Sequence, residues 1–168
     1  MARDFVLIVA AVGAAALIGI YMKKNIIDKS LPRAVRNNNP LNIRISAAND
    51  WQGELPEELN KATDSEFESF FNPVAGYRAA VIVLRNYQKK YGLFTLNDII
   101  NRFAPTVENN TNAYVNAVSD FVGVLPNDVI NLFDDNTMLQ VLLAMHKHEA
   151  GGIYFGEKLA LKGIQAAA

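Results

Sequence analysis

The sequence contains no cysteine, and its 168 residues include only two histidines and one tryptophan. The absence of cysteine excludes a disulfide framework, a thiol nucleophile and a thiolate metal site. His146 and His148 stand in the order HxHE, not HExxH, and no second His or Cys cluster could complete a zinc shell. Asp134 and Asp135 lack the alternating oxygen ligands of a calcium loop, and an N-cap explains them more simply. We therefore expect no metal site and no cofactor.

Clustered positive charge is also scarce in most of the chain. After Asn37 the sequence carries ten basic and fifteen acidic residues, a net charge of −5. Because nucleic-acid binding needs clustered Lys and Arg, this part of the chain argues against nucleic acid as the main ligand. Five basic residues instead gather within residues 23–36, where they would suit anionic lipid headgroups.

One long hydrophobic run is present, from Phe5 to Met22, with eighteen uncharged and mostly apolar residues. As a helix it would cover about 27 Å, close to the hydrocarbon thickness of a bilayer, which predicts a single transmembrane helix. A cleaved signal peptide is the alternative. However, the positive charge of Arg3 is cancelled by Asp4, and the run is not followed by a small-x-small cleavage site. The predicted organisation is an anchor at 1–24, a basic connector at 25–36 and a domain at 37–168.

Helical periodicity dominates from Pro73 onward, with apolar residues at steps of three and four and with caps at several boundaries. Before it, NIRI and FESFF could form two strands around the loop at 53–66. We expect a mainly α domain of α or α+β class, with about five helices and a small β element. The helical segments are 73–91, 96–104, 112–122, 127–135 (with Pro126 in its first turn), 137–149 as the central helix, and 157–165.

The end of the central helix is the most informative part of this domain. Glu149 lies in its last turn, directly ahead of Gly151 and Gly152. An ionised carboxylate there faces the negative end of the helix dipole, which costs roughly 0.3–1 kcal/mol. The dipole and burial both raise a carboxyl pKa, as a general acid working near neutral pH requires. The alternative is an ordinary exposed residue beside a glycine C-cap.

The asparagine-rich segment RNNNPLNIR, followed by W-x-G, is the second unusual feature. Consecutive asparagines hold turns or bind polar ligands through their side-chain amides. With nearby aromatic residues they would suit a sugar, whose hydroxyls bind amides and whose ring stacks on aromatic faces. A purely structural turn is the alternative. The candidate substrate-binding residues are Asn38, Asn39, Asn42, Trp51, Tyr77 and Tyr114.

These motifs, in the order RNNNPLNIR, W-x-G, FESFF, NAYVNAVSDFVGV and HEAGG, resemble a family of bacteriophage virion-associated proteins. The resemblance covers residues 36–166. Members of that family are structural, or lysozyme-like and transglycosylase-like. It implies an α+β lysozyme-like fold and partners that include peptidoglycan glycan strands, a lipid membrane and other virion proteins.

The same motifs are similar to peptidoglycan glucosaminidase domains in circularly permuted order, with the helix bearing the glutamate placed last. This similarity implies that Glu149 faces Asn38, Asn39 and Asn42 across one cleft and cleaves the β-1,4 bond between N-acetylmuramic acid and N-acetylglucosamine. HEAGG lacks the serine that usually follows the acid, so an inactive structural virion protein is the alternative.

Hydrolysis would require a second carboxylate, whereas a lytic transglycosylase needs only one. No acid near the predicted loop has a distinguishing spacing, which favours the transglycosylase. The candidates for a second carboxylate are Glu54, Glu57, Glu58, Asp64, Glu66 and Glu68.

The basic connector raises a question of orientation. The positive-inside rule would leave the domain in the cytoplasm, on the opposite side of the membrane from peptidoglycan. A virion assembled around a host-derived membrane would resolve the conflict. We therefore expect a single-pass protein of the virion membrane or the host inner membrane.

Overall fold

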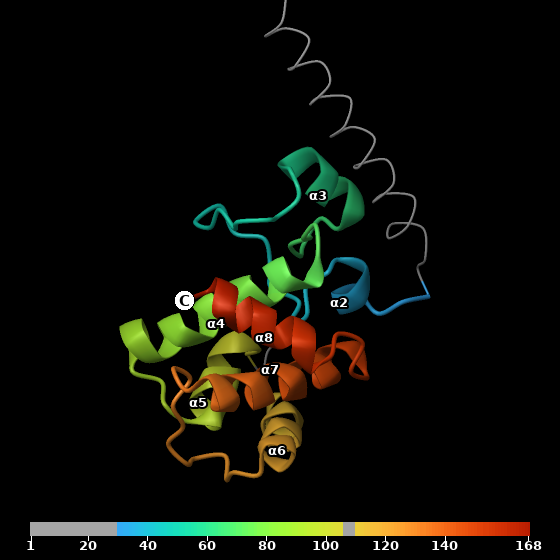
Figure 1. Cartoon of the computed structure of the whole chain (residues 1–168). Helices are drawn as coiled ribbons and strands as arrows, with labels where there is room; N and C mark the ends of the chain where they lie inside the picture. Colours follow the sequence, from blue (N-terminus) through green and yellow to red (C-terminus); the bar gives the residue numbers. More distant parts are fainter. Residues whose placement is uncertain (1–29, 106–109) are drawn as a thin grey trace, which may run out of the picture.

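The computed structural model describes residues 30–105 and 110–168. Seven helices lie within these residues, and their arrangement is shown in Figure 1. They are α2 (Arg33–Arg36), α3 (Glu57–Thr63), α4 (Pro73–Tyr91), α5 (Leu96–Phe103), α6 (Thr111–Val122), α7 (Asp135–Ala150) and α8 (Glu157–Ala166).

Local capping sets most of the predicted helix boundaries. Asn72 accepts a hydrogen bond from the N–H of Ala75 at the start of α4, and Gly92, with φ 65°, ends that helix. Thr95 caps α5 by accepting from the N–H of Asp98. Asp134 caps α7 by accepting from Thr137, so this aspartate has the capping role predicted for it. These signals lie within a few residues of each boundary and could therefore be read from the sequence.

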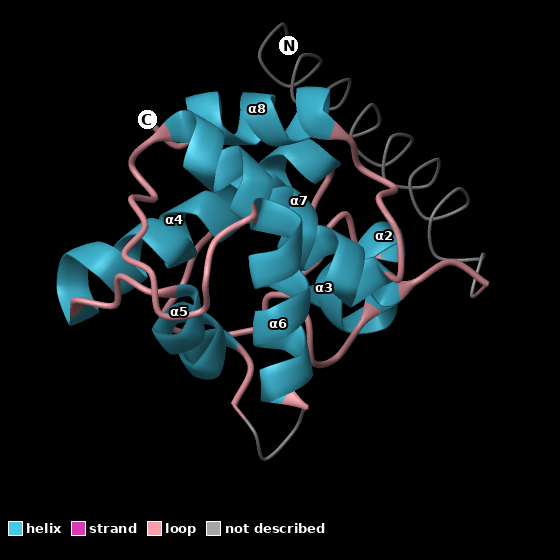
Figure 2. Cartoon of the chain, turned by 90° about the horizontal axis from the view of Figure 1, so that it is seen from below, coloured by secondary structure: helices cyan, strands magenta, loops and turns pink. Residues whose placement is uncertain are grey.

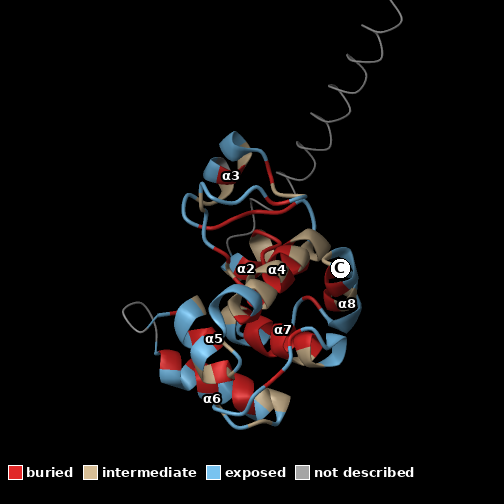
Figure 3. Ribbon diagram, turned by 90° about the vertical axis from the view of Figure 1, so that its left-hand side faces the viewer, coloured by how far each residue is buried: buried red, intermediate tan, exposed pale blue. Residues whose placement is uncertain are grey.

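Helix α7 lies at the centre of the domain, with α4, α6 and α8 packed around it (Figure 2). Its side chains from Met138 to His146 are almost all buried, which explains why its sequence is apolar on nearly every face. In the view of Figure 3, α3 and its loops form one end of the described part of the molecule, and α5 and α6 form the other. The long helix α4 and α7 connect these two ends.

The predicted β element is wrong in its extent. Segments 42–45 and 67–71 do run antiparallel, but the described residues contain isolated bridges, at Arg44–Phe67 and Glu54–Phe70, and no strand. The side-chain amide of Asn39 accepts from the Ile43 N–H and donates to the Glu68 carbonyl, so it takes up the two groups that would otherwise form the next ladder bond. The loop at 53–66 also contains α3, which we did not expect.

The helix predicted at 127–135 is also wrong. Gln88 of α4 holds this segment in an extended form, because its Nε2 donates to the Ile130 carbonyl at 2.8 Å and its Oε1 accepts from the Leu132 N–H at 2.9 Å. Val129 forms a further bridge with Thr95. These contacts come from residues more than thirty positions away, and they override the local helix signal of Pro126.

The expected fold class therefore needs correction. The structure has seven helices in its described residues instead of about five, and it has isolated bridges in place of a small β element. Among residues 30–105 and 110–168, no helix combines the length and apolar character needed to cross a bilayer. The predicted N-terminal transmembrane helix, Phe5 to Met22, lies outside the described residues.

Candidate active site

The asparagine-rich loop between α2 and residue 43 is built from turns that only a few residue types tolerate. Asn38 and Asn42 have φ values of 49° and 50°, in the left-handed region where asparagine is the most acceptable side chain after glycine. Helix α4 passes so close that a Cβ on Gly76 would lie 2.1 Å from the Asn38 carbonyl oxygen. This close contact fixes the loop against the core.

Two of the asparagines have structural contacts. The Nδ2 of Asn38 donates to the Phe70 carbonyl at 3.0 Å. Asn39 donates to Ile43 and Glu68 and accepts from the N–H of Ile43, each at 2.9 Å. Both side chains are buried, and neither lines the cleft described below. Asn38 and Asn39, which we predicted to bind substrate, therefore stabilise the loop instead of facing the cleft.

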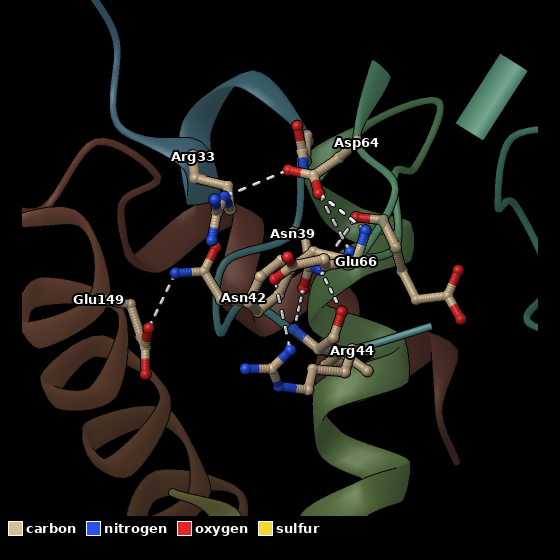
Figure 4. Close-up of polar contacts among 11 residues, drawn as sticks. Arg33, Asn39, Asn42, Arg44, Asp64, Glu66 and Glu149 are labelled. Carbon is tan, nitrogen blue, oxygen red and sulfur yellow. Dashed lines mark hydrogen bonds and ion pairs between the residues drawn. The ribbon is translucent and has the colours of Figure 1, made fainter. Parts of the chain in front are cut away.

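Asn42 differs from these two because its side chain points towards α7. Its Nδ2 donates to Oε2 of Glu149 at 2.8 Å, as shown in Figure 4. Glu149 is half-buried in the last turn of α7, and Gly151, with φ 70°, ends the helix just after it. The structure thus brings together the predicted acid and one of the three predicted asparagines. It also supplies a hydrogen-bond partner for an acid that has no neighbouring serine.

The environment of Glu149 changes its acidity. Burial raises the pKa of the Glu149 carboxyl above its ordinary value of 4.5, while Asn42 and Tyr114 act in the opposite direction. The Tyr114 hydroxyl is buried and has no hydrogen bond of normal geometry to any described residue, although it is near enough to affect the carboxyl. Burial also raises the pKa of Tyr114 well above 10, so its proton is retained. The result is a carboxyl that holds its proton unusually well, facing two groups that stabilise its ionised form.

Glu149 opens into a cleft of about 870 Å³ between the loops of residues 33–67 and helices α4 and α5. Its lining includes aromatic rings, amides and basic side chains, a mixture typical of sites that bind polar ligands. Two of the predicted substrate-binding residues, Asn42 and Trp51, line it. The other lining residues are Arg33, Ile43, Arg44, Ser46, Asn49, Phe67, Val83, Asn86, Tyr87, Lys90, Tyr91, Arg102, Phe103, Ala104 and Pro105.

The two predicted tyrosines lie outside this lining. Tyr77 is fully buried in the core, and its hydroxyl donates to the Phe155 carbonyl at 2.7 Å. The ring of Tyr114 stacks on His148 with centroids 3.8 Å apart, and its hydroxyl is close to Glu149. Tyr114 therefore contributes to the setting of the acid and is not placed to stack on a ligand in the cleft.

His146 has a structural role that the sequence did not indicate. Its Nδ1 donates to the Pro40 carbonyl at 3.0 Å, and its Nε2 accepts from the backbone N–H groups of Tyr154 and Phe155. Burial lowers the pKa of this imidazole and keeps it neutral. His146 thus joins the asparagine loop to the end of α7, which holds Asn42 opposite Glu149. No group of three or more metal-ligating side chains occurs within the described residues.

None of the other carboxylates that we considered lines the cleft, so among the described residues Glu149 is the only acid there. Five of the six carboxylates have a partner among the described residues. Asp64 pairs with Arg33, Glu66 with Arg44, and Glu57 with Lys61. Glu68 is buried and accepts from Asn60 at 3.0 Å, and Glu54 accepts from the N–H of Trp51 at 2.9 Å.

Several lining residues were missed. Tyr87 and Tyr91 fit the helical spacing of apolar residues in the segment 73–91, which indicates a buried face, although Tyr91 is 53% exposed. Lys90 and Arg102 resemble ordinary cations in the last turns of their helices. Tyr87, Lys90 and Tyr91 have ordinary helical spacing within α4. Nothing in that spacing indicates that Arg102 of α5 faces the same cleft.

The fold and site together define a small helical protein with a half-buried acid at the end of its core helix, open to a polar and aromatic cleft. No protein-family model matches the sequence. Over 139 residues the chain is 40% identical to protein P5 of Pseudoalteromonas phage PM2, and the match covers 82% of each chain. The chain belongs to the family of this phage virion protein. The predicted relationship to phage virion proteins is confirmed, and the relationship supports association with the virion.

Proposed function

We propose that the protein cleaves peptidoglycan as a lytic transglycosylase, with Glu149 as its general acid and base, during cell-wall penetration or release. The observation that carries this proposal is the half-buried Glu149 carboxyl, bonded to Asn42 and open to the cleft. A raised pKa keeps this carboxyl protonated closer to neutral pH, as a general acid requires. The earlier resemblance to transglycosylase-like proteins supplies the substrate.

The reaction needs one group that first gives and then takes a proton. The Glu149 carboxyl protonates the glycosidic oxygen as the bond from that oxygen to C1 of N-acetylmuramic acid breaks. The resulting carboxylate removes a proton from the C6 hydroxyl of the same sugar, whose oxygen bonds to C1. Glu149 is protonated again at the end, and no water is consumed. Asn42 and Tyr114 stabilise the ionised carboxylate between the two steps.

The acid content of the cleft favours this reaction over hydrolysis. Glycoside hydrolases generally use two carboxyl groups, about 5–5.5 Å apart for retention and 6.5–9.5 Å apart for inversion. Among the described residues Glu149 is the only acid that lines the cleft, and the carboxylates of Glu54, Glu66 and Glu68 are each held by another partner. A single carboxyl is sufficient when the attacking hydroxyl belongs to the substrate.

The cleft also contains groups suited to a sugar. The Oδ1 of Asn42 and the Nε1 of Trp51 are buried without a hydrogen-bond partner among the described residues. Buried polar atoms in folded proteins nearly always have partners, so these two are candidates for contact with ligand hydroxyl or acetamido groups. Tyr91 and Phe103 add aromatic surface on the opposite wall.

A non-catalytic virion component is the second candidate, because the family relationship supports a phage structural protein without indicating an activity. One experiment distinguishes the two candidate functions. Full-length protein is applied to purified peptidoglycan, beside Glu149→Gln and the control Glu157→Gln, which changes an exposed acid in the first turn of α8. We expect soluble anhydromuropeptides from the wild type and the control but not from Glu149→Gln. Folded wild-type protein that releases nothing would reject the enzyme.

A further inference from the structure

We propose that the cleft prefers glycan strands with ionised peptide stems, because Lys90 and Arg102 bind carboxylates of the stem. This inference rests on the proposed function and specifies the form of its substrate. In intact peptidoglycan the lactyl group of N-acetylmuramic acid is joined to the peptide by an amide bond. The sugars are therefore uncharged, and the carboxylates belong to the stems.

The charge of the cleft is opposite to that of the surrounding chain. Residues after Asn37 have a net charge of −5, whereas four cations, three of them after Asn37, and one acid line the cleft among the described residues. The acid is Glu149, whose raised pKa lets it keep its proton to a higher pH than an ordinary glutamate. Such a local excess of one sign attracts ligands of the other sign. The four cations are Arg33, Arg44, Lys90 and Arg102.

These four cations fall into two pairs. Arg33 and Arg44 belong to the wall formed by residues 33–67, where each has an acidic partner, at 3.2 Å and 3.5 Å respectively. Both guanidinium groups also lie over the ring of Phe67. Lys90 and Arg102 lie on the opposite wall and have no ion pair with any described residue. The second pair is therefore better placed to meet a ligand carboxylate.

The guanidinium group of Arg102 is positioned for that contact by two aromatic rings. Its guanidinium carbon lies 3.7 Å from the centroid of the Tyr91 ring and 5.2 Å from that of Tyr87. Stacking on an aromatic face orients the plane of the guanidinium group and leaves its N–H edge free for a carboxylate. Lys90 is exposed at the end of α4, one residue before Tyr91, and supplies a second positive charge on the same wall.

The test compares two substrates that differ in charge but not in backbone. Peptidoglycan strands are used either intact or after conversion of their carboxyl groups to primary amides with ammonia and carbodiimide. We expect the wild type to show a KM about tenfold higher for the amidated strands, with a smaller change in kcat. We expect the double variant Lys90→Gln/Arg102→Gln to show the same KM for both substrates. Lys158→Gln/Lys162→Gln on α8, outside the cleft, is the matched control and should keep the difference.

The outcomes separate this inference from the proposed function. Equal cleavage of both substrates by the wild type would overturn the inference and leave the transglycosylase standing, as would a preference retained by the Lys90/Arg102 variant. If the wild type cleaves neither substrate, binding of the same strands to Glu149→Gln decides. Tighter binding of intact strands that depends on Lys90 and Arg102 supports the inference, and equal binding overturns it. Salt screens contacts between exposed charges. The preference for intact strands should therefore also decrease as the NaCl concentration is raised from about 0.05 to about 0.5 M.

Discussion

The amide nitrogen of Asn42 lies 2.8 Å from Oε2 of Glu149, although the two residues are 107 positions apart in the chain. His146 holds them together, because its ring bonds the Pro40 carbonyl two residues before Asn42 while its own position on α7 is one turn before Glu149. The hydrogen bond favours the ionised carboxylate, and burial favours the protonated acid. The balance between these effects makes Glu149 suitable for both halves of a proton-transfer cycle.

Asn42→Ala tests this balance. The substitution removes a hydrogen bond that stabilises the ionised form, so the pKa of Glu149 should rise further. Since the reaction starts from the protonated acid, the alkaline limb of the kcat profile should move to higher pH. We also expect kcat near neutral pH to fall about tenfold, because the carboxylate formed in the first step is less stabilised. The measurement is the pH dependence of kcat on intact peptidoglycan.

The matched control for Asn42→Ala is Asn86→Ala, which removes an amide from the same cleft without touching Glu149. Its alkaline limb should stay at the wild-type pH, whatever its effect on KM. An Asn42→Ala limb that stays in place, or that moves to lower pH, would contradict the assigned role of this hydrogen bond.

Glu149→Gln should change the pH dependence of stability. Because the pKa of Glu149 is raised in the folded protein, the folded state holds this proton more tightly than the unfolded state. The resulting stability is fully present below the ordinary pKa of 4.5 and is lost as pH rises through the folded value. We therefore expect Glu149→Gln to have a higher Tm than the wild type at pH 7, with the difference shrinking below pH 4.5. Glu68, whose pKa is also raised, is present in both proteins and cancels in this comparison.

Thermal unfolding followed by circular dichroism measures the effect. A Glu149→Gln protein that is less stable than the wild type at pH 7 would show that the ionised carboxylate stabilises the fold. In that case the burial of Glu149 would not lower the stability of the folded protein at pH 7.

Asn39→Ala should destabilise the protein without changing its chemistry. The substitution leaves the Glu68 carbonyl oxygen and the Ile43 N–H without the partner that Asn39 supplies, whereas the Ile43 carbonyl keeps its bond from the Glu68 N–H. We expect a loss of about 2–4 kcal/mol in the free energy of unfolding, measured by urea denaturation, since unsatisfied buried groups are costly. At a temperature where the variant is folded, its kcat should remain within a few-fold of the wild type. A large loss of kcat with full stability would instead place Asn39 in the reaction.

The parts of the fold that follow local signals could be predicted, as the ends of α4 and the cap of α5 show. At Gly92 and Thr95 the boundary depends on one residue and its immediate neighbours. The segment at 127–135 could not be predicted, because the amide of Gln88 decides its conformation from a different helix. The expected strands failed for a similar reason, since the side chain of Asn39 takes the Ile43 N–H and the Glu68 carbonyl that would form the next ladder bond.

Some features of the site could likewise be predicted from the sequence, and others could not. The position of Glu149 at the end of an apolar helix was visible in the sequence, and so was the polar character of the asparagine run. Which asparagine meets the acid was not visible, because the left-handed conformation of Asn38 and Asn42 sets where each side chain points. Lys90 and Arg102 became candidates only when the packing of α4 and α5 placed them along one cleft.

The central claim is that Glu149 acts alone and that the substrate's own hydroxyl attacks. The most direct measurement is the mass of the muropeptides released by the wild type from peptidoglycan in water labelled with oxygen-18. We predict anhydro products that are one water lighter than hydrolysis products and contain no label, together with no release by Glu149→Gln. Labelled reducing-end products, or release by Glu149→Gln equal to that of the wild type, would contradict this account.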